Sequence, residues 1–312
     1  MHPMEMMVMM KLLPVLCAVV PSVTFWLVEA EVVKVDSFKN TQCKEFFYKD
    51  KEPSGIEDSS YTRICQHYRG QAYFASLYDK SRRIPLYSAS KFKFSITNEK
   101  CKKGKIDSKW KYEPQLADPS KHGDMLDIDD NVKKDTKIKE SQPVEIEYYN
   151  HTYYNTKYTR VYLTPPEYQT STCSQSATYT LTNAPPIPAD FETTWADIIK
   201  GIKMELNESC YLVHGAIPYK EGKWIPDKKH ERVAVPELIW MAYCCPGIQK
   251  VFLGHSDGEE TINFEVANKT LKLKRREVIE ILLPELTAIL QTNLNFMVGI
   301  FKNDCKKSEG WV

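Results

Sequence analysis

The chain has almost no net charge. Its 42 lysines and arginines are balanced by 41 aspartates and glutamates, which leaves a formal charge of +1 at neutral pH. A protein without an excess of positive charge has no long-range field that attracts nucleic acid over its whole surface. We therefore expect any contact with DNA or RNA to depend on a local basic patch.

The spacings typical of metal-binding loops are also missing. No two cysteines have two to four residues between them, which disfavours a structural zinc site. The acidic segment around Asp124, Asp127, Asp129 and Asp130 has neither the glycine nor the closing glutamate of an EF-hand loop in place. Because lysines follow these aspartates, the sequence predicts a solvated, charged connection over residues 99–145.

Long apolar runs are absent beyond the N-terminus. There, Lys11 precedes an apolar run at residues 12–20, and Val28-Glu29-Ala30 fits a cleavage site, so residues 1–30 are predicted to be a secretory signal peptide. An uncleaved membrane anchor is the alternative, but two prolines shorten the run. No later segment predicts a transmembrane span, and no Gly/Ser-rich linker or repeat divides the rest. A hydrophobic fraction of 42% suffices for a globular core.

Cysteine usage agrees with secretion. Of nine cysteines, removal of Cys17 with the signal peptide leaves eight, and an even number in a secreted chain favours disulfides. The pairing is open, except that the adjacent Cys244 and Cys245 should take different partners, since a bridge between neighbours strains the backbone. Asn150, Asn207 and Asn268 begin three glycosylation sequons, which also favour an extracellular glycoprotein. The candidate disulfide cysteines are Cys43, Cys65, Cys101, Cys173, Cys210, Cys244, Cys245 and Cys305.

The pattern of apolar residues predicts both strands and helices. A helix is expected near residues 194–206, with Asp190 or Thr193 as its N-cap, and a pair of amphipathic helices at 271–291, divided at Pro284. Without regular βαβ alternation, this predicts an α+β fold with a mixed central sheet. The main domain should span residues 31–270, with residues 271–312 packed on it as a C-terminal helical segment. Strands are expected at 72–78, 84–94, 158–163, 177–182, 210–216, 238–243 and 251–253.

One motif connects these elements to a known family. The run Tyr158-Thr159-Arg160-Val161-Tyr162-Leu163-Thr164-Pro165 has the frame of Tyr-Asp-Arg-Gly-His-Leu-Asn-Pro. Together with ordered anchors such as Arg83-Ile-Pro-Leu-Tyr87 and Val233-Ala-Val-Pro236, it resembles the DNA/RNA non-specific endonucleases, and more closely the vertebrate endonuclease domain-containing 1 proteins. The resemblance runs over residues 43–305 and implies a ββα-metal (His-Me finger) fold.

The resemblance also assigns expected roles, and several positions depart from them. In the family, the motif histidine activates water, the motif arginine steadies the phosphate, and an asparagine on the following helix holds Mg²⁺. Here Tyr162 stands at the general-base position, Arg160 matches the phosphate clamp, and Glu192 stands for the metal-binding asparagine. Thr159 and Val161 replace the flanking aspartate and glycine. A phenol is a poor base at neutral pH.

We therefore expect a secreted glycoprotein with an endonuclease-like domain and weak or no nuclease activity. One alternative is an active endonuclease dependent on Mg²⁺ or Mn²⁺, in which Glu192 binds the metal and His151 or His214 replaces the lost base. The other is an extracellular protein-interaction module that never meets nucleic acid. Steep salt dependence distinguishes nucleic-acid binding from the last reading, because phosphate contacts release counterions.

Overall fold

The computed structural model describes residues 32, 37–55, 58–93, 104–144, 158–207, 210–225, 230–266, 269–294, 299–301 and 305. Residues 1–30, Cys101, Asn150, His151 and Asn268 lie outside the described residues. The predicted signal peptide and the three sequons therefore stay predictions.

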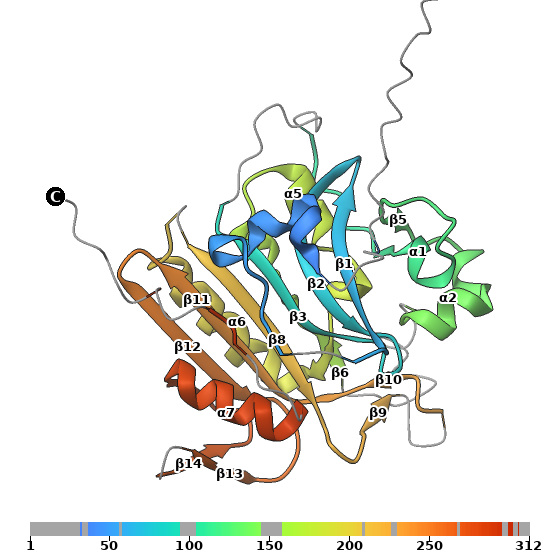
Figure 1. Ribbon diagram of the computed structural model, residues 1–312. Helices are drawn as coiled ribbons and strands as arrows, with labels where there is room; N and C mark the ends of the chain where they lie inside the picture. The colour runs from blue at the N-terminus through green and yellow to red at the C-terminus, as the bar shows by residue number, and fades with distance from the viewer. Residues whose placement is uncertain are drawn as a thin grey trace, which may run out of the picture.

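The fold is α+β and is dominated by one antiparallel sheet (Figure 1). Seven strands follow the order β1-β2-β3-β8-β11-β12-β15, and each of the six neighbouring pairs is antiparallel. The expected mixed sheet is thus wrong in its strand directions. The reason is connectivity, because β1–β2, β2–β3 and β11–β12 are joined by short turns, and such turns make antiparallel pairs. These strands are β1 (Tyr61–Tyr68), β2 (Gln71–Asp79), β3 (Ile84–Lys91), β8 (Tyr211–Pro218), β11 (Pro236–Cys245), β12 (Ile248–His255) and β15 (Val278–Ile281).

In the part of the chain that the structure describes, four two-stranded sheets and several helices lie around the main sheet. The small sheets pair β4 with β5, β6 with β7, β9 with β10, and β13 with β14. Their strands are β4 (Lys111–Tyr112), β5 (Leu126–Asp127), β6 (Tyr158–Arg160), β7 (Pro186–Pro188), β9 (Trp224–Ile225), β10 (Val233–Ala234), β13 (Thr261–Val266) and β14 (Lys269–Lys274). The α-helices are α1 (Pro114–Ala117), α2 (Thr136–Ser141), α5 (Thr172–Ala177), α6 (Ala189–Lys203) and α7 (Leu283–Leu294). The 3-10 helices are η1 (Phe38–Asn40), η2 (Gln42–Phe46), η3 (Tyr48–Asp50), η4 (Val132–Lys134), η5 (Pro166–Tyr168) and η6 (Leu181–Asn183).

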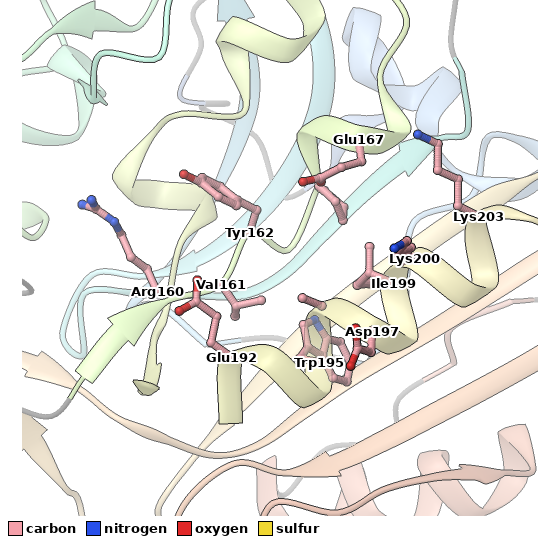
Figure 2. Close-up of a pocket in the computed structure, with 12 residues that line it drawn as sticks. Arg160, Val161, Tyr162, Glu167, Glu192, Trp195, Asp197, Ile199, Lys200 and Lys203 are labelled. Atoms are coloured by element: carbon pink, nitrogen blue, oxygen red, sulfur yellow. The ribbon is translucent and has the colours of Figure 1, made fainter. Parts of the chain in front are cut away.

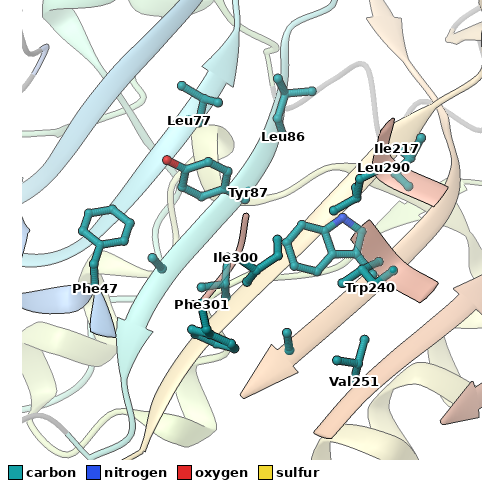
Figure 3. Close-up of a cluster of buried hydrophobic side chains, with 14 of the residues drawn as sticks. Phe47, Leu77, Leu86, Tyr87, Ile217, Trp240, Val251, Leu290, Ile300 and Phe301 are labelled. Carbon is teal, nitrogen blue, oxygen red and sulfur yellow. The ribbon is translucent and has the colours of Figure 1, made fainter. Parts of the chain in front are cut away.

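Alternation along the strands creates two cores on opposite faces of the sheet. In β11, Trp240 belongs to the core beneath α7, and its neighbour Met241 belongs to the core beneath α6. The two long helices accordingly cover different faces (Figure 1). The α7-side core also takes in side chains from the N-terminal 3-10 helices and from the segment around Phe301 (Figure 3).

The same alternation explains the disulfides at the end of β11. Cys244 is bonded to Cys305 in the α7-side core, and Cys245 is bonded to Cys210 in the α6-side core. The expectation of different partners for the adjacent cysteines is confirmed, and the two-residue period of the strand is the physical reason. A third bridge joins Cys43 to Cys65. Cys173 is disulfide-bonded as well.

Several sequence-based expectations about elements are wrong. The strand expected at 177–182 is replaced by the end of α5 and by η6, because Ser171 and Ser174 form a capping box that starts a helix. Of the helix pair expected at 271–291, only α7 forms, with Pro284 in its first turn, while the earlier half supplies β14 and β15. Helix α6 begins at Ala189, so neither Asp190 nor Thr193 caps it.

Candidate functional site

The motif begins a unit of two short antiparallel strands followed by a helix. Strand β6 holds Thr159 and Arg160, its partner β7 ends at Pro188, and α6 begins at the next residue. Beyond β6 the pairing continues, because the Leu163 N–H donates to the Asn183 carbonyl (2.9 Å). The buried Asn183 side chain also accepts from the Thr164 N–H (2.8 Å). The expected strand at 158–163 is therefore shorter, and the rest is an extended loop tied to Asn183.

This unit forms a pocket of about 480 Å³ that contains the three site residues suggested by the sequence. Arg160, Tyr162 and Glu192 all line it (Figure 2). Its apolar wall is formed by Val161, Pro165, Trp195, Ala196 and Ile199, and its charged rim by Glu167, Asp197, Lys200 and Lys203. The lining thus balances Arg160, Lys200 and Lys203 against Glu167, Glu192 and Asp197, which gives no net excess of positive charge.

Tyr162, at the general-base position, is part of an aromatic cluster. Its ring stacks on Trp110 at 5.6 Å between centroids and 5° between planes, and it meets the edge of Tyr179 at 5.4 Å. Burial raises the pKa of the Tyr162 phenol, while the charge of Arg160 opposes that rise only in part. A neutral, stacked phenol does not take a proton from water at physiological pH.

Arg160 is almost fully buried, with 5% of its surface exposed. Its guanidinium lies over the indole of Trp110, with Cζ 3.6 Å from the ring centroid. An arginine over an indole keeps its charge and loses rotamer freedom. Sequence reasoning missed Trp110, because this residue lies fifty positions before Arg160 and only the fold brings the two together.

The neighbouring residue Val161 is buried, whereas Thr159 and Glu192 are not. Val161 is buried and packs with the α6-side core, so its side chain occupies space that a glycine leaves open. Thr159 lies within β6 and pairs with Ile187. Glu192 is exposed in the first turn of α6, where a negative charge is favoured by the helix dipole.

A metal at this position would have few protein ligands. Within the described residues, no group of three or more His, Cys, Asp or Glu side chains is placed to hold a metal ion. Mg²⁺ nevertheless keeps much of its water shell and is often held by one or two carboxylates together with substrate phosphates. The exposed carboxylate of Glu192 fits that limited role.

His214, which the sequence offered as an alternative base, lies away from the pocket. It lies in β8 between β3 and β11, is 1% exposed, and does not line the pocket. Burial lowers its pKa to about 3, with a smaller opposite contribution from the backbone of Leu163. The expectation that His214 could act as the base is therefore wrong on its position in the sheet. His151 lies outside the described residues.

Comparisons with known proteins agree with the resemblance seen in the sequence. No family model matches the chain. The human Endonuclease domain-containing 1 protein is 26% identical over 293 residues, which is 91% of this chain and 51% of that protein. The mouse protein of the same name is 25% identical over 212 residues, or 65% of this chain and 38% of that protein. The chain thus spans about half the length of the human protein and a smaller share of the mouse protein. Its similarity to both supports an endonuclease-like domain.

Proposed function

We propose that this chain is a secreted, disulfide-bonded module with a degenerate ββα-metal endonuclease fold, which binds a phosphate-containing ligand and cleaves it weakly or not at all. The observation that carries the proposal is the content of one pocket. It retains the arginine of the motif beside an acidic residue at the start of the helix, but the base position holds Tyr162 in an aromatic stack. The order β6, β7, α6 supports the assignment of the fold.

The expected loss of activity follows from the replacement of the general base by Tyr162. A positioned base contributes about 10²–10⁴ to rate, and the Tyr162 phenol does not supply it because burial raises its pKa. Arg160 still offers charge and directed N–H donors to a phosphate oxygen. When bound, Mg²⁺ or Mn²⁺ supplies Lewis-acid stabilisation of the phosphate, and Glu192 is the residue that would hold it. We therefore expect the site to keep its ability to bind phosphate and to lose most of its ability to cleave it.

Cleavage assays test this proposal. The purified chain is incubated with plasmid DNA and with RNA in Mg²⁺ or Mn²⁺, beside an EDTA control and the triple variant Thr159→Asp, Val161→Gly, Tyr162→His. We expect a silent or weak wild type and a gain of metal-dependent cleavage in the variant. Adding Arg160→Ala to the triple variant should abolish the gain. Cleavage by the wild type that EDTA stops would instead identify an active endonuclease.

Binding assays separate the proposal from a protein-interaction module. Anisotropy of a labelled single-stranded DNA, measured over a range of salt concentrations, reports phosphate contacts through the slope of affinity against salt. We expect measurable binding at low salt that weakens as salt rises. No binding at low salt would favour an extracellular protein-interaction module without nucleic acid.

Secretion is tested separately. Asn207 is exposed just after α6, so it is accessible to a glycan. Expression of the full chain in mammalian cells should place the protein in the medium, with a mass that falls on treatment with a glycosidase. Asn207→Gln should remove part of that mass. Retention of the unglycosylated chain inside the cell would contradict the extracellular assignment.

A further inference from the structure

Trp110 lies outside the motif and outside the residues that line the pocket, but it contacts Arg160 directly. It comes from the segment just before β4, whereas Arg160 ends β6, and the two are brought together only by the fold. The Arg160 Cζ atom lies 3.6 Å from the centroid of the indole, which is close enough for direct contact between the two planar groups. Trp110 is therefore the immediate support of the arginine that the pocket presents.

The indole is itself fixed by its neighbours. Tyr162 stacks parallel to it, and Tyr179 meets it edge-on at 6.3 Å and 80°. The Trp110 carbonyl accepts a hydrogen bond from the Ile128 N–H (2.9 Å), which holds the backbone of this segment. A ring restrained by two aromatic side chains and its own backbone makes a rigid surface for a guanidinium.

Contact with a ring engages the face of a guanidinium and leaves its N–H donors directed around the rim. Arg160 lines the pocket, and 5% of its surface remains exposed. A free arginine side chain loses considerable rotamer entropy when it binds an anion, and one already held in place loses less. The contact with Trp110 is thus suited to pre-organising the anion-binding donors.

We propose that Trp110 is a positioning residue, which holds Arg160 so that its donors meet an anionic oxygen of a phosphodiester in the pocket. This inference rests on the proposed function, since it specifies how the same pocket binds its ligand. It also assigns a task to Tyr162, whose ring supports Trp110 from the base position.

The test uses the full secreted chain and a short fluorescein-labelled single-stranded DNA, with anisotropy measured in EDTA so that no strand is cut. Trp110→Ala removes the supporting ring, and Trp110→Phe keeps a smaller one. Trp224→Ala is the matched control, because Trp224 packs against the same apolar cluster of Ile84, Leu181 and Ile225, whereas Arg160 lies over Trp110. The urea midpoint of each variant is measured alongside.

We expect Trp110→Ala to weaken binding by roughly 2- to 30-fold, the range of a cation–π contact converted to affinity. Trp110→Phe should recover most of the affinity, and Trp224→Ala should leave it unchanged. In an Arg160→Lys background, which keeps the charge but lacks the planar face, Trp110→Ala should add little further loss. Equal losses in both backgrounds, or wild-type binding by Trp110→Ala, would overturn the positioning role.

A second readout is independent of binding. The Arg160 Nε–Hε signal, followed by NMR in protein labelled with ¹⁵N-arginine and assigned through Arg160→Lys, should be shifted by the ring current of Trp110. The shift should persist in Trp110→Phe and vanish in Trp110→Ala. If the wild type binds no DNA but this pattern appears, the proposed function fails while the Arg160–Trp110 contact stands. If the chemical shift of Arg160 Nε–Hε is unchanged in Trp110→Ala, the inference is overturned, whatever the binding result.

Discussion

The hydroxyl of Tyr158 donates a hydrogen bond of 2.8 Å to the carboxylate of Asp257, which joins β6 to the loop after β12. The same carboxylate pairs with Lys223, from the loop before β9. Three segments far apart in the sequence therefore meet at one acidic side chain at the start of the strand that carries Arg160. The junction adds to the pairing with β7 in holding β6 in place.

Removing that junction should destabilise the protein. Asp257→Ala leaves the phenol of Tyr158 and the ammonium of Lys223 without this partner, so we expect a loss of about 1–3 kcal/mol in the free energy of unfolding. Urea denaturation followed by circular dichroism measures the loss. Asp130→Ala is the control, because Asp130 pairs with Lys133 while 89% of its side chain is exposed. A loss no larger than that of Asp130→Ala would contradict the prediction.

The buried His214 should make the protein sensitive to acid. Its pKa is lowered to about 3 in the folded chain, against about 6.5 in the unfolded one, so the unfolded state binds more protons between these values. Stability contributed by the neutral ring is complete above about pH 6.5 and is lost as the pH falls, at up to about 1.4 kcal/mol per pH unit.

Urea midpoints measured from neutral pH down to mildly acidic pH test this dependence. His214→Leu should flatten the acid limb of the curve, whereas His122→Gln should leave it as in the wild type, because His122 is exposed. If the urea midpoints of wild type and His214→Leu fall equally as the pH is lowered, groups other than His214 cause the loss of stability.

The disulfide between Cys244 and Cys305 should contribute strongly to stability. It closes a loop with a sequence separation of 61, for which chain entropy predicts about 4 kcal/mol. The double variant Cys244→Ser, Cys305→Ser should lower the free energy of unfolding by about that amount. Peptide mapping without reduction should recover Cys244 with Cys305 and Cys245 with Cys210. Recovery of crossed pairs would contradict the assignment of these cysteines to opposite faces.

Packing against Trp240 should forbid a side chain at position 215. A Cβ at Gly215 would overlap the indole of Trp240, which is buried at 1% exposure in the sheet core. We expect Gly215→Ala to cost about 1–3 kcal/mol or to prevent folding. Gly201→Ala is the matched control: it lies in α6 with nothing within 4 Å of the new Cβ, and should stabilise by about 0.5–1 kcal/mol. Thermal midpoints of both variants decide the comparison.

Local signals in the sequence located the strands around Leu77, Tyr87 and Trp240, because period-two patterns and turn residues act within a few positions. They failed at residues 177–182, where a β-branched and aromatic run supplies buried hydrogen bonds instead of a strand. There the Thr180 and Thr182 hydroxyls donate to the carboxylate of Glu113, a residue from a distant segment. Such contacts override local propensity, and no pattern within the run reveals them.

The sequence by itself determined that a tyrosine stands at position 162 of the motif. With Tyr162 in the frame of the motif, a neutral phenol stands where the family that the chain resembles carries a histidine, and this follows from the identity of one residue. Only the tertiary structure decided what that phenol does. It stacks on Trp110, which in turn supports Arg160, and these contacts join segments that lie fifty residues apart. Residue identity fixes what a side chain can do chemically, whereas the partners that orient it depend on long-range packing of the whole chain.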